Sequence, residues 1–121
     1  MAEEMLREIF RLQKQFDDAV ATHRGLDYSP DVWIQKEVLA IISELSEILD
    51  EVNFKWWKDP KEINHEKLTE EIVDVLHFFV SMCIKAGIGP EELYQAYIRK
   101  NRENFARQEG ATDREGYAWK K

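Results

Sequence analysis

Apolar residues recur at intervals of three and four along most of this 121-residue chain, which is the spacing of one face of an α-helix. The pattern predicts helices over residues 2–23, 30–52, 65–86 and 90–108, followed by a tail over residues 108–121. Two helix starts are marked by Ser29-Pro30 and Gly89-Pro90, because proline suits the first turn. No alternating pattern of useful length indicates a strand. We expect an all-α fold, a four-helix bundle in one domain over residues 1–121.

Composition narrows the classes of partner. The formal net charge of −7 argues against a nucleic-acid partner, whose phosphates are neutralised by basic residues. No signal peptide is expected from the acidic opening "MAEEMLREIF", and no apolar run is long enough to cross a membrane. The single Cys83 cannot form an internal disulfide. This suggests a reducing, cytoplasmic setting, with Cys83 itself serving as a small buried residue.

The most apolar stretch, "EEIVDVLHFFVSMCI" at residues 70–84, contains three ionisable groups. Placed on a helical wheel, its apolar residues cover an arc of roughly 240°, so we expect this helix to be buried on most sides. Glu71 falls inside that arc, while Asp74 and His77 lie at its two edges. A buried carboxylate needs a compensating cation. That cation is either a Lys or Arg of a neighbouring helix or a metal ion.

The preceding helix carries a second acidic group in "SELSEILDE". Glu44 borders the apolar stripe of this helix, and Glu47 and Glu51 turn further away. Alone, such residues usually form a solvated acidic face. Together with Glu71 and Asp74 they make two acid pairs at i, i+3 on consecutive helices, which can face each other and hold a hard cation. Magnesium is the natural candidate, since it shares its ligands with substrate phosphates.

A di-iron site is the competing metal hypothesis. Asp74-x-x-His77 superficially matches the Glu-x-x-His motif of di-iron bundles. A second motif is missing, because Val20 stands three residues before His23, and Glu62 and His65 fall in an expected loop. The sequence therefore disfavours this chemistry.

The last predicted helix changes character along one face. Its apolar stripe begins with Leu93, Ala96 and Tyr97 and continues as Lys100, Asn101, Asn104, Arg107 and Gln108. A polyanion lying against the second half would explain the change, because these side chains bind phosphate oxygens well. A frayed, exposed helix end with basic residues is the alternative.

The connection "NFKWWKD" places Lys55 and Lys58 around Trp56 and Trp57. The tryptophans either plug the core or pack against a base while the lysines neutralise phosphates. An acidic cage, a basic face and aromatic residues together point to a nucleoside triphosphate with magnesium. There is no Walker A glycine loop in the sequence.

The acids form the pattern ExxE…ExxD, which resembles the signature of the all-α, MazG-like nucleoside triphosphate pyrophosphohydrolases. The words "LQKQFDD", "FKWWK", "EEIVDVLHFF" and "YIRKNRENFARQEG" are similar to those of the dimeric-type dUTP diphosphatases. Phage dCTP/dUTP hydrolases of the same group carry a similar C-terminal half. The resemblance covers nearly the whole chain. The sequence departs from the family pattern in two ways. In "RQEGATDREGY" the spacing between RQ and GY is longer than usual, which leaves a role for Tyr117 open. The chain is also shorter than many family members.

The resemblance implies a hydrolase that converts dUTP to dUMP and pyrophosphate. It assigns Mg²⁺, with Mn²⁺ as a substitute, to the catalytic residues Glu44, Glu47, Glu71 and Asp74, with Glu47 orienting the attacking water. It assigns phosphate contacts to Lys55, Lys100, Asn104 and Arg107, with Asn101 nearby. It assigns the base and deoxyribose pocket to Gln13, Asp17, Trp56, His77 and Phe78.

Three functional hypotheses follow. The first is a dUTP diphosphatase, and the second is the same chemistry on dCTP or on another nucleotide. The third is a non-enzymatic helical interaction module. Because the 65–86 helix is apolar over a wide arc, we also expect self-association into a dimer or tetramer, with a site lined partly by the neighbouring chain.

Overall fold

A computed structural model describes residues 2–112 and 114–119 of the chain. The helices are α1 (Ala2–Arg24), α2 (Pro30–Glu51), α3 (His65–Lys85) and α4 (Pro90–Gln108). No strand occurs among the described residues. The all-α class is confirmed, and every helix begins and ends within one residue of its predicted position.

The helix starts follow from local chemistry. Ser29 and Gly89 are extended, and each precedes a proline that opens a helix, as the sequence predicts. The Asn64 side chain accepts a hydrogen bond of 3.1 Å from the Lys67 backbone N–H. It thereby satisfies one of the unpaired donors at the start of α3.

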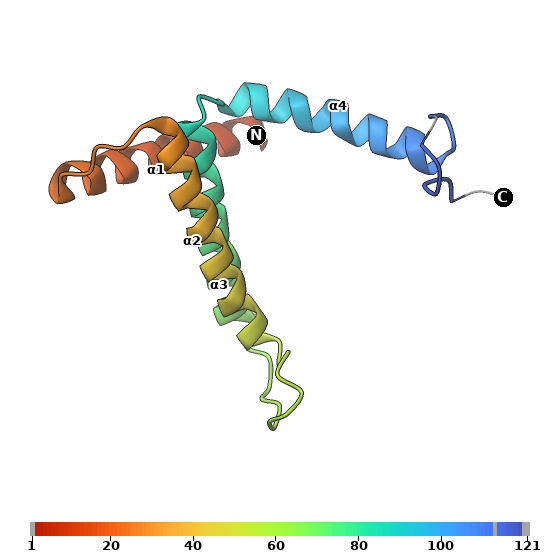
Figure 1. Ribbon diagram of the computed structural model, residues 1–121, viewed down its shortest axis with the longest axis horizontal. Coiled ribbons are helices and arrows are strands. Elements are labelled where there is room, and N and C mark those ends of the chain that lie inside the picture. The colour runs from red at the N-terminus through yellow and green to blue at the C-terminus, as the bar shows by residue number, and fades with distance from the viewer. Residues whose placement is uncertain (1, 113, 120–121) are drawn as a thin grey trace. The chain divides into compact units, whose positions relative to one another are not determined.

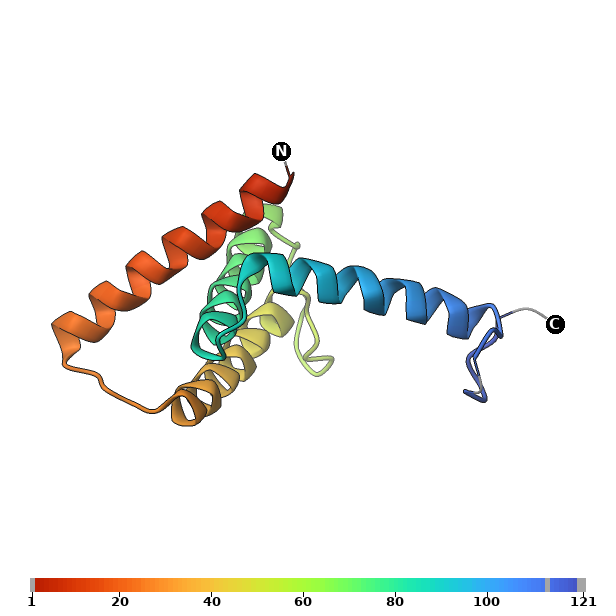
Figure 2. The same cartoon turned by 90° about the horizontal axis from the view of Figure 1, so that it is seen from above.

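The chain divides into two compact units, Met1–Ile88 and Gly89–Lys121. In the first unit, α2 and α3 form an antiparallel hairpin and lie side by side in both views (Figures 1 and 2), and α1 packs on α3. The buried apolar residues are Phe10, Val80 and Cys83. The prediction of a buried, unbridged Cys83 is confirmed.

The connection between α2 and α3 is held by Asn53. This residue has a φ of 60°, a conformation that asparagine tolerates better than most residues. Its side chain accepts a hydrogen bond from the Lys61 N–H (2.9 Å) and donates one to the Lys61 carbonyl (2.8 Å). These bonds close the loop that contains Trp56 and Trp57.

The expectation that α3 is buried on most sides is wrong for the single chain. Ile72, Val73, Leu76 and Phe79 are exposed, and Ile72 keeps 51% of its surface accessible. The reason is that α1 and α2 pack against only part of this helix.

The second unit consists of α4 and the tail. The Trp119 backbone N–H donates a 2.7 Å hydrogen bond to the Gln108 carbonyl. The Trp119 ring packs edge-to-face against the Phe105 ring. Positions 113 and 120–121 of the predicted tail lie outside the described residues. One domain over residues 1–121 stays a prediction.

No single helix within the described residues is both long and apolar enough to cross a membrane, and only the bent pair His65–Lys85 with Pro90–Gln108 meets that criterion by length and composition.

Candidate functional site

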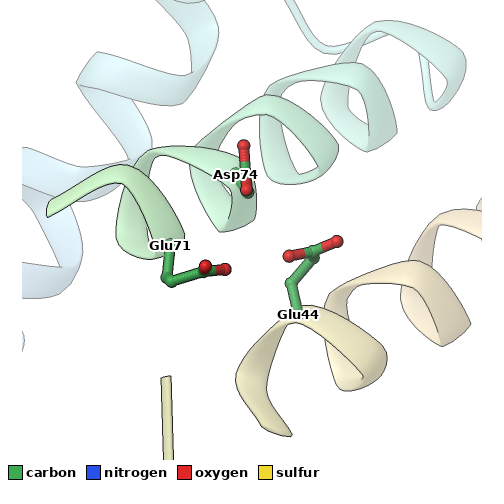
Figure 3. Close-up of side chains that lie close together, drawn as sticks. All are labelled: Glu44, Glu71 and Asp74. Atoms are coloured by element: carbon green, nitrogen blue, oxygen red, sulfur yellow. The ribbon is translucent and has the colours of Figure 1, made fainter. Parts of the chain in front are cut away.

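Three carboxylates from two helices meet in the first unit. Glu44 of α2 and Glu71 and Asp74 of α3 each offer an oxygen, and these oxygens all lie within 4.8 Å of one another. Figure 3 shows the Glu44 and Glu71 side chains in the space between the helices, with Asp74 beside Glu71 on α3. The i, i+3 spacing puts Glu71 and Asp74 on one face of α3, and the antiparallel hairpin brings Glu44 opposite them.

Negative charge accumulates at this carboxylate cluster (Glu44, Glu71 and Asp74). The pKa of Glu71 is raised, first by desolvation and then by the charges of Glu47, Asp74 and Glu44. Glu47 is exposed and is not one of the three residues whose oxygens meet, but its charge still acts on Glu71. Carboxylate oxygens in such a group are the ligands that hard divalent cations prefer.

The cluster belongs to a longer arrangement along α2. Glu37, Glu44 and Glu51 follow one another at intervals of seven residues, so they lie on one face of the helix. We call them the glutamate row. Across the hairpin, Lys67, Asp74 and Ser81 are spaced in the same way on α3. Because the helices are antiparallel, Lys67 lies opposite Glu51, Asp74 opposite Glu44 and Ser81 opposite Glu37.

Glu51 is compensated by lysines. It is 5% exposed, and its carboxylate lies 3.6 Å from the Lys61 ammonium and 3.8 Å from the Lys67 ammonium. The sequence expectation that Glu51 turns away from the apolar stripe is therefore wrong, because the glutamate row faces α3.

A cavity of about 610 Å³ lies beside the carboxylate cluster, within the size range of small-molecule sites. It extends along all three helices of the first unit. Its lining comprises Gln13, Phe16, Asp17, Val20, Leu26, Trp33, Glu37, Glu44, Asp74, His77, Phe78, Ser81 and Lys85.

A chain of hydrogen bonds orders the polar wall of this cavity. The Ser81 hydroxyl donates to Asp17 Oδ2 (2.7 Å), and Gln13 Nε2 donates to Asp17 Oδ1 (2.8 Å). His77 Nδ1 lies 2.6 Å from Gln13 Oε1. An amide oxygen only accepts, so the proton of this bond is on Nδ1. The chain fixes the orientation of the His77 ring, which is exposed rather than part of the core.

Glu37 lies further along the same wall. Desolvation raises the pKa of its carboxyl, the nearby Ser81 hydroxyl lowers it, the charge of Asp17 raises it, and the charge of Lys85 lowers it. The Lys85 ammonium itself lies over the Trp33 ring, 4.5 Å from its centroid.

The structure gathers some of the residues expected from the sequence and leaves others apart. Gln13, Asp17, His77 and Phe78 line the cavity together with Glu44 and Asp74. Three others, Lys55, Trp56 and Lys58, do not line this cavity. Lys55 pairs with Asp50 at 3.6 Å, and Trp56 is 85% exposed.

Sequence reasoning missed Trp33, Glu37, Ser81 and Lys85, which also line the cavity. In this chain Trp33, not Trp56, is the tryptophan of the cavity wall. The signal that could have found Glu37 and Ser81 is the seven-residue spacing from Glu44 and Asp74.

The residues expected to contact phosphates on α4 belong to the second unit. Lys100, Asn101, Asn104 and Arg107 lie at helical spacings of three and four, and three of them are linked through contacts within the helix. Lys100 pairs with Glu103 at 3.7 Å, and Arg107 pairs with Glu103 and donates a 3.2 Å hydrogen bond to Asn104. The Arg107 guanidinium also lies 5.8 Å from the centre of the Tyr117 ring.

Fold and site together define an all-α protein with a carboxylate cluster beside a cavity of ligand size. The sequence profile of the family described as dUTPase matches residues 5–92. This chain therefore belongs to the dUTPase family. The match covers most of α1 and all of α2 and α3, so the segment "YIRKNRENFARQEG" at residues 97–110 lies entirely outside it.

Two phage proteins are related in sequence. The dCTP pyrophosphatase of Enterobacteria phage LZ5 is 32% identical over 75 residues, covering 62% of this chain and 44% of the relative. The dCTP pyrophosphatase of Enterobacteria phage T4 is 30% identical over 88 residues, covering 61% and 52%. The matching regions thus span about half the length of these relatives. No solved structure gives a significant match.

Proposed function

We propose that this protein hydrolyses a pyrimidine deoxynucleoside triphosphate, with dUTP and dCTP as the two candidates, to the monophosphate and pyrophosphate in the presence of magnesium. One observation carries the proposal. The oxygens of Glu44, Glu71 and Asp74 lie within 4.8 Å of one another, and two of these residues also line a cavity of about 610 Å³. Membership of the dUTPase family supports it.

The metal would be held by the carboxylate cluster. Its residues fit a hard cation, because all the donors are oxygens and because desolvation and the charges of neighbouring carboxylates raise the pKa of Glu71. Bound there, magnesium would neutralise charge on the phosphate oxygens. Manganese takes similar oxygen ligands and is the expected substitute.

The protein's own residues would perform the remaining steps. The oxygen of a water attacks phosphorus, and the bridging P–O bond between the α and β phosphates breaks. Glu47 is our candidate for orienting that water and taking its proton, since it is exposed and its charge acts on Glu71. The leaving phosphate oxygen carries away the electron pair of the broken bond.

Two groups of residues would bind the substrate, one holding the nucleoside and the other the phosphates. Gln13, Asp17, His77 and Phe78 line the cavity and would hold the nucleoside. The cationic and amide groups Lys55, Lys58, Lys100, Asn101, Asn104 and Arg107 would contact phosphates, a role that suits such donors.

The second candidate substrate is dCTP. The observation that favours it is that both phage relatives are dCTP pyrophosphatases. Uracil and cytosine differ at the 4-position, where uracil carries an acceptor and cytosine a donor, so the lining of the cavity determines the preference.

We also propose that the active form is a homo-oligomer. The face of α2 opposite the glutamate row is apolar and exposed, with 65% of Leu39 and 57% of Ile42 accessible. This helix therefore turns carboxylates toward α3 and apolar side chains outward. Such a face indicates an interaction surface.

The test is product analysis by chromatography with Mg²⁺ and a panel of dUTP, dCTP, dTTP, dATP, dGTP and UTP. Conversion of dUTP to dUMP, with little turnover of the others, would support the first candidate. Faster conversion of dCTP would support the second. No turnover of any nucleotide, with Mg²⁺ and Mn²⁺ both tried, would overturn the proposal and favour a non-enzymatic helical module.

A further inference from the structure

The glutamate row presents three buried or half-buried carboxylates to α3, and two of them have an observed or a proposed cationic partner. Glu51 has two lysines. Glu44 belongs to the carboxylate cluster, for which a cation is proposed. Glu37 has neither, and the structure leaves part of its hydrogen-bonding capacity unused.

Glu37 is 7% exposed, and its Oε2 atom is buried with no hydrogen-bond partner among the described residues. The residue lines the cavity. Buried carboxylate oxygens are normally paired, so one without a partner calls for an explanation. A ligand that donates a hydrogen bond in the cavity is the explanation that fits its position.

The neighbouring donors are already engaged. The Ser81 hydroxyl proton and one of the two Gln13 amide N–H groups are donated to Asp17. The Lys85 ammonium lies over the Trp33 ring, from where it acts on Glu37 through its charge. The wall near Glu37 is therefore rich in acceptors, and it suits a ligand group that carries N–H donors.

The distance along α2 fits a nucleotide. Glu37 precedes Glu44 by seven residues, a rise of about 10.5 Å along a helix. A nucleotide whose phosphates lie at the carboxylate cluster would place its sugar near His77 and Phe78. Its base would then lie at the level of Glu37 and Trp33.

We propose that Glu37 is a specificity-determining residue that accepts a hydrogen bond from the 4-amino group of cytosine through Oε2. The inference rests on the proposed function. A carboxylate is a natural partner for the cytosine amino group, whereas uracil presents a carbonyl oxygen at the same position. Two acceptors would then face each other. Glu37 therefore favours dCTP over dUTP.

The experiment compares wild type with Glu37→Gln, measuring kcat/KM for dCTP and dUTP with Mg²⁺. A hydrogen bond to a charged group contributes about 1.5–3 kcal/mol, so we expect the dCTP/dUTP ratio to fall by about 10- to 100-fold. Glu51→Gln is the matched control, because it removes a charge from the same row near the lysines. That variant should leave the ratio unchanged.

Measurements of nucleotide binding test this inference independently of the proposed hydrolysis. Calorimetric titration with dCMP and dUMP needs no turnover, so it tests Glu37 even if wild type hydrolyses neither triphosphate. Weakened dCMP binding with retained dUMP binding supports the role of Glu37. Equal losses for both nucleotides, or no loss, would overturn it and indicate a structural residue or a carboxylate satisfied by water.

A ligand-side measurement covers the case in which Glu37→Gln does not fold. The deoxynucleotide of 2-pyrimidinone has hydrogen in place of the 4-amino group. Wild-type protein should bind it at least about tenfold more weakly than dCMP, the loss expected when a hydrogen bond to a charged group is missing. Equal affinity for the two nucleotides would contradict the proposal.

Discussion

At the scale of single residues, Glu71 combines a destabilising environment with a proposed metal-binding role. Its pKa is raised by desolvation and by three neighbouring carboxylates. A neutral group of the same shape removes the repulsion but also removes a charged ligand. Residues that bind cations often destabilise the empty site in this way.

We therefore expect Glu71→Gln to raise the melting temperature of the metal-free protein at neutral pH. Turnover of the preferred nucleotide should fall by more than the roughly 10- to 100-fold lost when a residue that only orients metal ligands is removed. Calorimetry without metal and kinetics with Mg²⁺ measure the two effects. A lower melting temperature would show that Glu71 has a cationic protein partner instead.

The pH dependence follows with a definite sign. A carboxyl whose pKa is higher in the folded state binds its proton more readily there, so folding is less favourable once the group ionises. The contribution of Glu71 to the stability of the metal-free protein is present at low pH and is lost as pH rises through the folded-state pKa. Glu71→Gln should remove this slope.

Glu71 and Asp74 could be predicted from sequence because acids at i, i+3 in a very apolar helix stand out. Glu37 and Ser81 could not be found in that way. Glu37 looks like an ordinary charged residue of α2, and Ser81 like a small polar residue of α3. Their burial depends on the register between two helices, which becomes visible only when the hairpin is formed.

At the scale of elements, the boundaries of all four helices were predictable because local chemistry sets them. Pro30 and Pro90 follow extended residues at helix starts, and Asn64 caps α3. The orientation of the helices was harder to predict. The α3 residues Ile72 and Phe79 looked buried by hydrophobicity alone, yet neither α1 nor α2 covers them.

The loop between α2 and α3 depends on Asn53. We expect Asn53→Ala to lower the free energy of unfolding by about 1–3 kcal/mol. The substitution removes two hydrogen bonds. It also places alanine at a positive φ, which asparagine tolerates better. Asn53→Gly keeps the backbone conformation accessible and should cost less. Urea denaturation of the three proteins measures the difference; equal losses in both variants would contradict the backbone argument.

At the scale of the whole molecule, far more large apolar side chains are exposed than buried among the described residues. Phe10, Val80 and Cys83 are the buried apolar residues of the described chain. Exposed ones occur on each of the first three helices: Ile9, Leu12 and Phe16 on α1, Leu39, Ile42 and Leu45 on α2, and Ile72, Leu76 and Phe79 on α3. So little burial in one chain is typical of subunits that are stabilised by association.

Light scattering coupled to size-exclusion chromatography should therefore give the mass of a dimer or a tetramer. Ile42→Glu, on the face of α2 opposite the glutamate row, should shift the protein toward monomer and lower its melting temperature. Gln15→Glu adds the same charge at an exposed polar position and serves as the control. A monomeric wild type that melts cooperatively would contradict the association argument.

The seven-residue spacing of the glutamate row has a consequence for how the length of α2 can change. One residue inserted between Glu44 and Glu51 would rotate everything after it by about 100°. Glu51 would then leave Lys61 and Lys67, while Glu37 and Glu44 would keep their places. An insertion of seven residues in both α2 and α3 preserves the facing levels. The hairpin can thus lengthen by whole heptads, and a single inserted residue separates its lysine-paired end from the carboxylate cluster.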